Sequence, residues 1–201
     1  MIRVVLAEDQ GMFRSAVRRL LELEGDIEVV GEGSTGVELL ATVEAERPDV
    51  AVVDIEMPDM DGLTAAERIR DQVPECKVLI VTTFGRPGFF QRAMAGGAAG
   101  FVLKDAPAEA LADAIRRCAA GDRIIDPGLA AAAMRIGASP LSAREREVLV
   151  ATTSGAGVAE ISKTLHLSQG TVRNKVSSAI AKLGARNRAD AVRIAGHNGW
   201  L

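Results

Sequence analysis

The sequence contains few of the residues on which metal centres and disulfide frameworks depend. Among 201 residues there are two Cys, two His, one Trp and no Tyr. Cys76 and Cys118 lie in apolar periodic segments without CxxC or Cys/His spacing, which predicts buried, reduced thiols instead of a disulfide or a metal site. His166 and His197 lie at the ends of expected helices without metal partners, so capping or surface roles are expected. Trp200 is expected to pack the last helix and not to stack on a base.

Long hydrophobic runs are also lacking. No stretch approaches the roughly 20 uncharged apolar residues of a membrane-spanning helix, and Met1-Ile2-Arg3 leads directly into an expected strand instead of a signal peptide. The sequence therefore predicts a cytoplasmic protein without membrane insertion. An apolar content of 48% with 25% charged residues is sufficient for a packed core and too rich in core formers for a disordered chain.

Charge is distributed unevenly along the chain. Residues 1–120 contain 13 Lys and Arg and 21 Asp and Glu, a formal charge of −8, whereas residues 121–201 contain 11 and 6, a formal charge of +5. An acidic half beside a basic half suggests two roles, with the basic half a candidate for contact with a polyanion. Two solvated surfaces that merely differ in charge are the alternative.

The first half alternates short β-branched runs with amphipathic stretches, a pattern typical of a parallel sheet covered by helices. Right-handed crossovers in such a doubly wound α/β sheet, here of five strands and flavodoxin-like, place a functional site at the carboxyl ends of the strands. Strands are expected at Ile2–Ala7, Ile27–Gly33, Val50–Asp54, Lys77–Thr82 and Gly100–Leu103, and helices at about 11–24, 35–47, 62–72, 87–97 and 107–120.

The second half is expected to be a small all-α domain. Residues 121–138 lack a clear apolar period and are expected to be a linker, in which 129–136 could form a helical turn or two. Ser142 and Glu145 have the spacing of a capping box and predict a helix to about Thr153. Further helices are expected at about 158–165, 169–182 and 187–198. The predicted organisation is a domain at 1–120, a linker at 121–138 and a helical domain at 139–201.

Polar residues occur where the apolar strands of the first half end. Glu8 and Asp9 follow the first strand, Asp54 ends the third, Thr82 ends the fourth, and Lys104 follows the fifth. These strand ends converge in a parallel sheet, and clustered carboxylates are tolerable only if a cation or a lysine compensates them. An oxygen-rich cluster favours a hard cation such as Mg²⁺. Taken singly, each residue also fits a capping or solvated role.

The motifs that contain these residues resemble those of response-regulator receiver domains. The similar segments are Ala7-Glu8-Asp9, Asp54-Ile55-Glu56-Met57-Pro58-Asp59-Met60-Asp61-Gly62, Thr82-Thr83 and Lys104-Asp105, within residues 1 to about 120. The resemblance implies that Asp54 accepts a phosphoryl group from a sensor histidine kinase. It implies that Mg²⁺ is held by Glu8, Asp9, Asp54 and the backbone carbonyl of Glu56.

The resemblance also implies a switch in the strands beside Asp54. Lys104 would pair with the phosphoryl oxygens, Thr82 would hydrogen-bond the phosphoryl group, and Phe101 would rotate inward behind Thr82, although a plain core role for Phe101 is an equal alternative. Lys104 is followed by Asp105 instead of the Pro common in receivers, which makes a cis peptide there doubtful. Pro58 and Gly62 belong to turn chemistry that closes a loop and starts a helix.

Residues 158–182 have the spacing of a helix-turn-helix motif. His166-Leu167-Ser168 separates two amphipathic helices, with Ser168 as N-cap of the second. From spacing alone, a generic helical hairpin is an equal alternative. The apolar residues that repeat at three or four positions and are expected inside are Ile161, Leu165, Val172, Val176, Ile180 and Leu183. The residues expected outside are Thr171, Arg173, Asn174, Lys175, Ser177, Ser178 and Lys182.

The same half resembles the four-helix LuxR/GerE-type domain over about residues 140–199. The similar segments are Leu141–Leu149, Glu160-Ile161-Ser162, Leu165, Leu167-Ser168, Thr171-Val172-Arg173, Lys182-Leu183-Gly184 and Asn187–Ala191. The resemblance implies that helix 169–182 enters the major groove and that helix 187–198 pairs two subunits. Departures are Lys175, where His is common, and the Thr152–Gly157 connection. The DNA contacts expected are Ser168, Thr171, Arg173, Asn174, Lys175, Ser177, Lys182 and Arg188, with Arg173, Asn174 and Ser177 facing bases and the Lys residues and Arg188 facing phosphates.

Together the two resemblances imply a response regulator of the NarL/FixJ class, not an enzyme beyond its own phosphoryl transfer and dephosphorylation. The segment 82–93 is similar to regulators of membrane-lipid desaturation. Phosphorylation would promote a homodimer that binds double-stranded promoter DNA, with exposed Phe89 or Phe90 as candidates for the dimer surface beside the first, fourth and fifth helices.

Two alternatives stay open. A haloacid-dehalogenase-like phosphatase also uses a strand-end Asp with Mg²⁺, but it requires a second Asp two residues later, where this chain has Glu56. A transcription factor with a degenerate receiver would not need phosphorylation, and the intact set of Asp9, Asp54, Thr82 and Lys104 argues against it.

Overall fold

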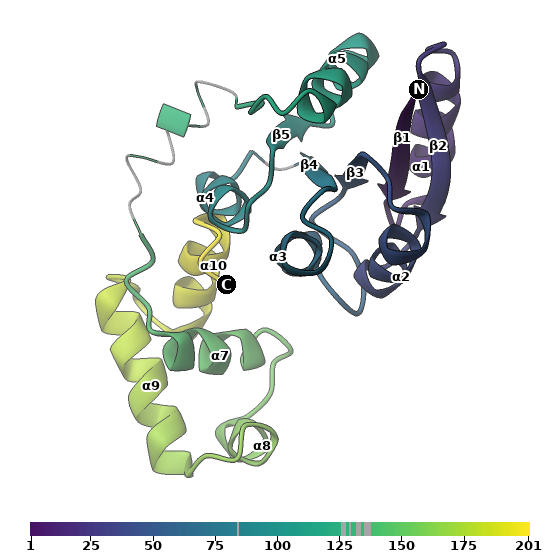
Figure 1. The fold of residues 1–201 in the computed structure, drawn as a ribbon. Helices are drawn as coiled ribbons and strands as arrows, with labels where there is room; N and C mark the ends of the chain where they lie inside the picture. Colours follow the sequence, from purple (N-terminus) through teal and green to yellow (C-terminus); the bar gives the residue numbers. More distant parts are fainter. Residues whose placement is uncertain (84, 126–127, 129, 132–133, 135–137) are drawn as a thin grey trace. The chain divides into compact units, whose positions relative to one another are not determined.

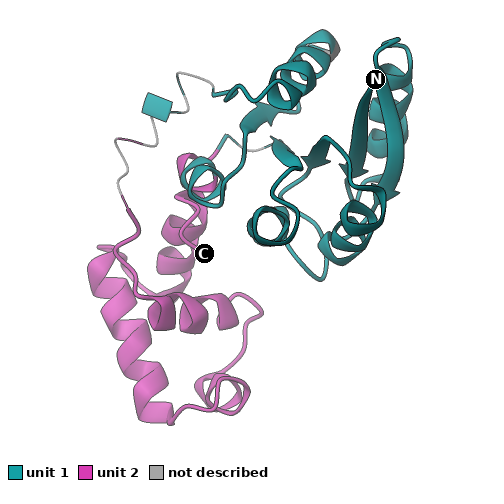
Figure 2. Cartoon of the chain, in the orientation of Figure 1, with its two compact units in different colours: residues 1–85, 90–131 teal, residues 86–89, 132–201 magenta. Residues whose placement is uncertain are grey.

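The computed structural model describes residues 1–83, 85–125, 128, 130–131, 134 and 138–201. The chain divides into two compact units, Met1–Gly85 with Phe90–Ala131 and Arg86–Phe89 with Ala132–Leu201 (Figure 2). Within the expected linker, residues 126–127, 129, 132–133 and 135–137 lie outside the described residues, among them five of the eight residues 129–136 that could form a helical turn or two.

A five-stranded parallel sheet forms the centre of the first unit (Figure 1). Its order, β2-β1-β3-β4-β5, is that of a doubly wound flavodoxin-like sheet, which confirms the predicted fold class. Four strands have the expected bounds, and the third ends one residue early, so that Asp54 lies just beyond it. The strands are β1 (Ile2–Ala7), β2 (Ile27–Gly33), β3 (Val50–Val53), β4 (Lys77–Thr82) and β5 (Gly100–Leu103).

Helices connect the strands, and side-chain caps define where two of them begin. The Thr35 side chain accepts a hydrogen bond from the Glu38 N–H before α2, and Asp61 accepts one from the Thr64 N–H before α3. α2 ends at Arg47, which has a left-handed φ of 46°. The helices of this unit are α1 (Gly11–Glu22), α2 (Gly36–Glu46), α3 (Gly62–Gln72), α4 (Pro87–Ala95), whose first residues belong to the second unit, and α5 (Ala108–Ala119).

The core of the first unit lies on both faces of the sheet. Residues at even positions of the central strands, such as Val4 and Val52, pack with Val17 of α1 and Ile115 of α5. Val5, at an odd position, is fully buried as well, and α2 packs against β1 and β2 while α3 packs against β4. Burial on both faces explains why the strands are almost continuously apolar. Cys76 and Cys118 are buried, unpaired thiols, as expected.

Between Ala138 and Leu201 the second unit contains four helices, and the first of them has the predicted capping box. The Ser142 side chain accepts from the Glu145 N–H, and the Glu145 carboxylate accepts from the Ser142 N–H. Leu149, Ala179 and Ala191 form one buried cluster, against which Trp200 packs, and Val148, Ile161 and Val172 form another. The helices are α7 (Ala143–Ala151), α8 (Val158–Thr164), α9 (Gln169–Lys182) and α10 (Arg188–His197) (Figure 1).

Candidate functional sites

Three carboxylates converge at the carboxyl end of the sheet. Glu8 and Asp9 follow β1 and Asp54 follows β3, and each offers an oxygen within 4.8 Å of the others. The Lys104 ammonium, from the segment after β5, lies 2.6 Å from a Glu8 oxygen and 3.1 Å from an Asp54 oxygen. The topology therefore brings together the strand-end residues that the sequence singled out, and Lys104 supplies the compensating positive charge.

Burial and ion pairing act against each other in this cluster. Glu8 and Asp54 are about 5% exposed, and burial raises the pKa of both carboxyls, while contact with Lys104 opposes the rise. Burial acts to lower the pKa of Lys104, but its contacts with the two carboxylates outweigh burial and the net direction is upward. The arrangement therefore favours a charged lysine beside carboxylates whose ionised form burial disfavours.

Hydrogen bonds and one close backbone approach hold the loops that carry these carboxylates. The Arg14 guanidinium of α1 donates to the Glu8 carbonyl and pairs with Glu32 of β2 at 3.0 Å. Asp54 Oδ1 accepts from its neighbour's amide at 2.8 Å. A Cβ at Gly62 would lie 1.9 Å from the Asp54 carbonyl oxygen, so only glycine allows α3 to start this close to the site. Arg14 had not been predicted as part of the site.

The remaining predicted receiver residues lie on β4, on β5 and in the loop after β3. Thr82 is buried at the end of β4, where its carbonyl accepts from the Lys104 amide at 2.9 Å. Phe101 is buried within β5. The Glu56 side chain is exposed and does not join the three clustered carboxylates. The described part of the chain contains no cis peptide bond, so the bond between Lys104 and Asp105 is trans, in line with the doubt about a cis bond there.

The expectation that Phe90 is exposed was wrong. Phe90 is 6% exposed and packs its ring edge-on against Phe101, with centroids 5.7 Å apart. It is thus a core residue beside β5 and cannot contribute to a dimer surface without unpacking. Phe89 is half-buried, and the Arg86 guanidinium lies 5.2 Å from its ring centroid.

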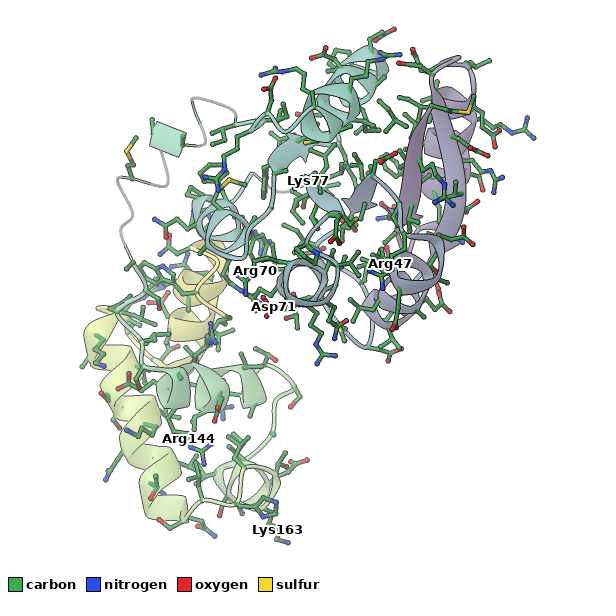
Figure 3. The ribbon with its side chains drawn as sticks, viewed as in Figure 1. Arg47, Arg70, Asp71, Lys77, Arg144 and Lys163 are labelled. Carbon is green, nitrogen blue, oxygen red and sulfur yellow. The ribbon has the colours of Figure 1, made fainter. Side chains whose placement is uncertain are left out.

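The surface of α9 carries most of the residues predicted to contact DNA. Ser168 is the N-cap of α9 and its hydroxyl accepts from the Thr171 N–H at 3.0 Å. Arg173, Asn174 and Ser177 are exposed, whereas Val172 and Ala179 on the other side of the helix are buried. The predicted inner face, Ile161, Leu165, Val172, Val176, Ile180 and Leu183, lies in the two apolar clusters of this unit. Basic residues also occur on neighbouring helices, among them Arg144 of α7 and Lys163 of α8 (Figure 3).

Two residues of α9 expected outside have a protein partner that the sequence did not indicate. Ser178 donates to one Glu145 oxygen and Lys182 pairs with the other, both at 2.7 Å. Glu145 is 3% exposed, and these contacts, led by that with Lys182, hold the pKa of its carboxyl well below the usual range. Arg188 is half-buried and donates to the Ala156 carbonyl at 3.1 Å. A carboxylate within a capping box was the only sequence signal of this network.

Comparison with known families decides what these two units are. Residues 4–116 match the model of the response regulator receiver domain, and residues 139–195 match that of bacterial regulatory proteins of the LuxR family. The chain belongs to the response regulator family. This response regulator combines a receiver domain with a LuxR-type DNA-binding domain, and its relatives are DNA-binding response regulators of two-component systems.

The relatives of this response regulator extend over its whole length. The transcriptional regulatory protein DesR of Bacillus subtilis (strain 168) is 45% identical over 201 residues, which cover all of both chains. The response regulator ChrA of a heme-sensing two-component system is 33% identical, with a TM-score of 0.59 over 100% of this chain and 98% of that one. RcsB of Salmonella enterica serovar Typhimurium, bound to promoter rprA in the presence of the phosphomimetic BeF3-, is 26% identical, with a TM-score of 0.72 over 96% and 97%.

Among the described residues of this response regulator, no helix combines the length and apolar character that crossing a membrane requires.

Proposed function

We propose that this response regulator is phosphorylated on Asp54 by a sensor histidine kinase and that phosphorylation promotes dimerisation and binding to promoter DNA. The observation that carries the proposal is the position of the Lys104 ammonium, 2.6 Å from Glu8 and 3.1 Å from Asp54. A carboxylate nucleophile beside a fixed cation is suited to phosphoryl transfer, where positioning and charge neutralisation supply most of the catalysis.

We further propose a cytoplasmic location, with domain limits at 1–120 and 139–201 and a linker at 121–138.

In the proposed reaction an Asp54 carboxylate oxygen forms a bond to phosphorus. The bond between phosphorus and the kinase histidine nitrogen breaks, and the nitrogen keeps the electron pair, so that an acyl phosphate remains on Asp54. Lys104 holds positive charge beside the transferred group, and the Thr82 hydroxyl donates to one of its oxygens. Phe101 follows Thr82 inward, and this rearrangement changes the surface of the domain in response to the new charge on Asp54.

The donor set at the strand ends suits Mg²⁺. Three carboxylates within 4.8 Å are hard oxygen ligands, and Glu8, Asp9, Asp54 and the backbone carbonyl of Glu56 are the groups proposed to hold the ion. When bound, Mg²⁺ would neutralise charge on the phosphoryl oxygens. With three carboxylates facing one lysine, the excess negative charge of this chain's own residues supports the assignment.

The proposed DNA surface is the exposed side of α9 with its N-terminal turn. Arg173, Asn174 and Ser177 are proposed to contact base edges, because their side chains are exposed opposite the buried Val172. Phosphate contacts are proposed for Ser168, Thr171, Lys175, Lys182 and Arg188. Of these, Lys182 and Arg188 already have protein partners, so their effects on DNA affinity should be accompanied by effects on stability.

Mass spectrometry of the full chain tests the phosphorylation site. Acetyl phosphate with Mg²⁺ should add one phosphoryl group to the wild type and none to Asp54→Asn. The wild type should bind one phosphoryl group per chain and should not hydrolyse acetyl phosphate continuously. Labelling that persists in Asp54→Asn would refute the assignment. Sustained hydrolysis of small phosphoesters by the wild type would favour a phosphatase.

A further inference from the structure

We propose that Phe13 is a positioning residue for phosphoryl transfer, and that its aromatic face holds the Lys104 ammonium over the acidic cluster. The Nζ atom of Lys104 lies 4.7 Å from the centroid of the Phe13 ring. This distance is within the range of a cation–π contact, in which the negative face of the ring attracts a cation. The inference rests on the proposed phosphorylation of Asp54 and adds a residue that the strand-end motifs do not contain.

The local sequence explains why a ring is present at this point. α1 begins at Gly11, directly after Glu8, Asp9 and Gln10, so Phe13 lies in its first turn. Phe13 packs against the same core cluster as Val17 and Leu21, which follow at intervals of four residues along the inner face of the helix. The loop that supplies two carboxylates is thereby coupled to the ring that faces the lysine.

The Lys104 ammonium is buried among the two carboxylates and the Phe13 ring. The Lys104 side chain is 6% exposed and contacts Glu8 and Asp54 through its nitrogen. Phe13 lines a cavity together with Glu8 and Asp54 and a second cavity together with Lys104. The Phe13 ring therefore borders both the cavity at the acidic cluster and the cavity lined by Lys104.

An aromatic ring has an advantage here over a polar partner. An ammonium group has three N–H donors, and two short contacts, to Glu8 and Asp54, already draw on them. A third carboxylate beside Lys104 would compete with the incoming phosphoryl group for the N–H donors of the ammonium. A ring face attracts the positive charge without a lone pair that accepts one of these donors. Lys104 can then exchange an Asp54 oxygen for a phosphoryl oxygen while the ring keeps it in place.

Fluorinated phenylalanines at position 13 test this role with little change in packing. Successive fluorine atoms weaken the negative face of the ring, so the rate of Asp54 phosphorylation by acetyl phosphate should fall stepwise from Phe to trifluoro-Phe, by about two- to tenfold in total. The same series at Phe90, whose ring faces Phe101, should show no such trend. Equal or rising rates across the Phe13 series would overturn the inference.

A spectroscopic measurement supplies an independent readout. The Phe13 ring should shift the protons next to the Lys104 ammonium upfield in NMR spectra of the wild type. Phe13→Leu should abolish this shift, while the other receiver signals remain those of a folded domain. An unshifted Lys104 signal in the wild type would contradict the contact. If the wild type is not labelled on Asp54 at all, the proposed function fails; if it is labelled and the Phe13 series has one rate, only the role of Phe13 fails.

Discussion

The Nζ atom of Lys182 on α9 lies 2.7 Å from Oε2 of Glu145 on α7. Glu145 also accepts from Ser178 of α9 and from both the N–H and the hydroxyl of Ser142. One buried carboxylate therefore caps α7 and also holds α9, the helix proposed to contact DNA, against α7. Because the shared acceptor is a buried carboxylate, although Lys182 is 41% exposed, the network should contribute more to stability than a fully exposed ion pair.

Replacing Glu145 by Ala should destabilise the second unit by about 2–4 kcal/mol, because Lys182 and Ser178 lose a buried acceptor. Urea unfolding followed by Trp200 fluorescence measures this, since Trp200 is the only Trp, the chain has no Tyr, and Trp200 packs in the second unit. Arg144→Ala is the matched control, because it breaks an exposed pair with Glu147 on the same helix and should cost less than about 0.5 kcal/mol. Equal losses for the two variants would contradict the network.

The stability of the second unit should decrease as the solution becomes acidic. The pKa of Glu145 is lowered by its contacts with Lys182, Ser178 and Ser142, so its stabilisation is fully present above the unfolded pKa of about 4.3 and is lost as pH falls through the lower folded pKa. Asp190, whose pKa is lowered to about 2, acts with the same sign. The urea concentration at the unfolding midpoint, reported by Trp200, should decrease as the pH is lowered below about 4. The decrease should be less steep in Glu145→Gln. The same slope in both proteins would show that Glu145 does not cause it.

The sequence predicted Glu145 as a capping residue but not as a cross-link between helices. The capping box depends on residues three positions apart, which are close in any helix. The contacts with Ser178 and Lys182 join residues 33 and 37 positions apart, and they depend on how α7 packs against α9. Polar and charged residues of amphipathic helices are ordinarily placed outside, which is why the pattern predicts Ser178 and Lys182 on the solvent side.

Gly62→Ala should disturb the receiver strongly. The added Cβ would lie 1.9 Å from the Asp54 carbonyl oxygen and 2.9 Å from Val53, so the backbone that carries the nucleophile must shift. We expect a loss of about 1–3 kcal/mol in stability, as for other overpacked sites, together with slower labelling of Asp54. Circular dichroism and acetyl phosphate labelling are the measurements. Gly25→Ala, where a Cβ meets nothing within 4 Å, should change neither, and an unaffected Gly62→Ala would refute the close approach.

Arg173→Ala should reduce base discrimination, whereas Lys175→Ala should weaken binding to all sequences. A lost contact with a base should cost about 1–3 kcal/mol on the cognate duplex and little on a scrambled one. A lost phosphate contact should lower both affinities and the salt dependence. Fluorescence anisotropy with both duplexes at two salt concentrations measures this, with Arg19→Ala of the receiver helix α1 as a control of equal charge change. Equal losses for Arg173→Ala on the two duplexes would place the reading surface elsewhere.

The acidic site followed from the sequence more completely than the aromatic residues around it. Glu8, Asp54 and Lys104 each follow a strand, and a parallel sheet brings its strand ends together whatever the side-chain packing. Phe13 and Phe90 lie within helices, where an apolar residue does not reveal what its ring faces. The ring of Phe13 against Lys104 and that of Phe90 against Phe101 are products of packing between distant segments, which periodicity does not encode.

The coupling of Asp54 phosphorylation to DNA binding is the central claim, and one affinity comparison tests it most directly. Genome-wide footprinting first supplies a bound duplex, and anisotropy then measures its affinity for the wild type and Asp54→Asn, each with and without acetyl phosphate and Mg²⁺. We predict that acetyl phosphate tightens binding by the wild type about 5- to 150-fold, the usual range of coupling between two sites, and leaves Asp54→Asn unchanged. Equal affinities in all four measurements would contradict the account.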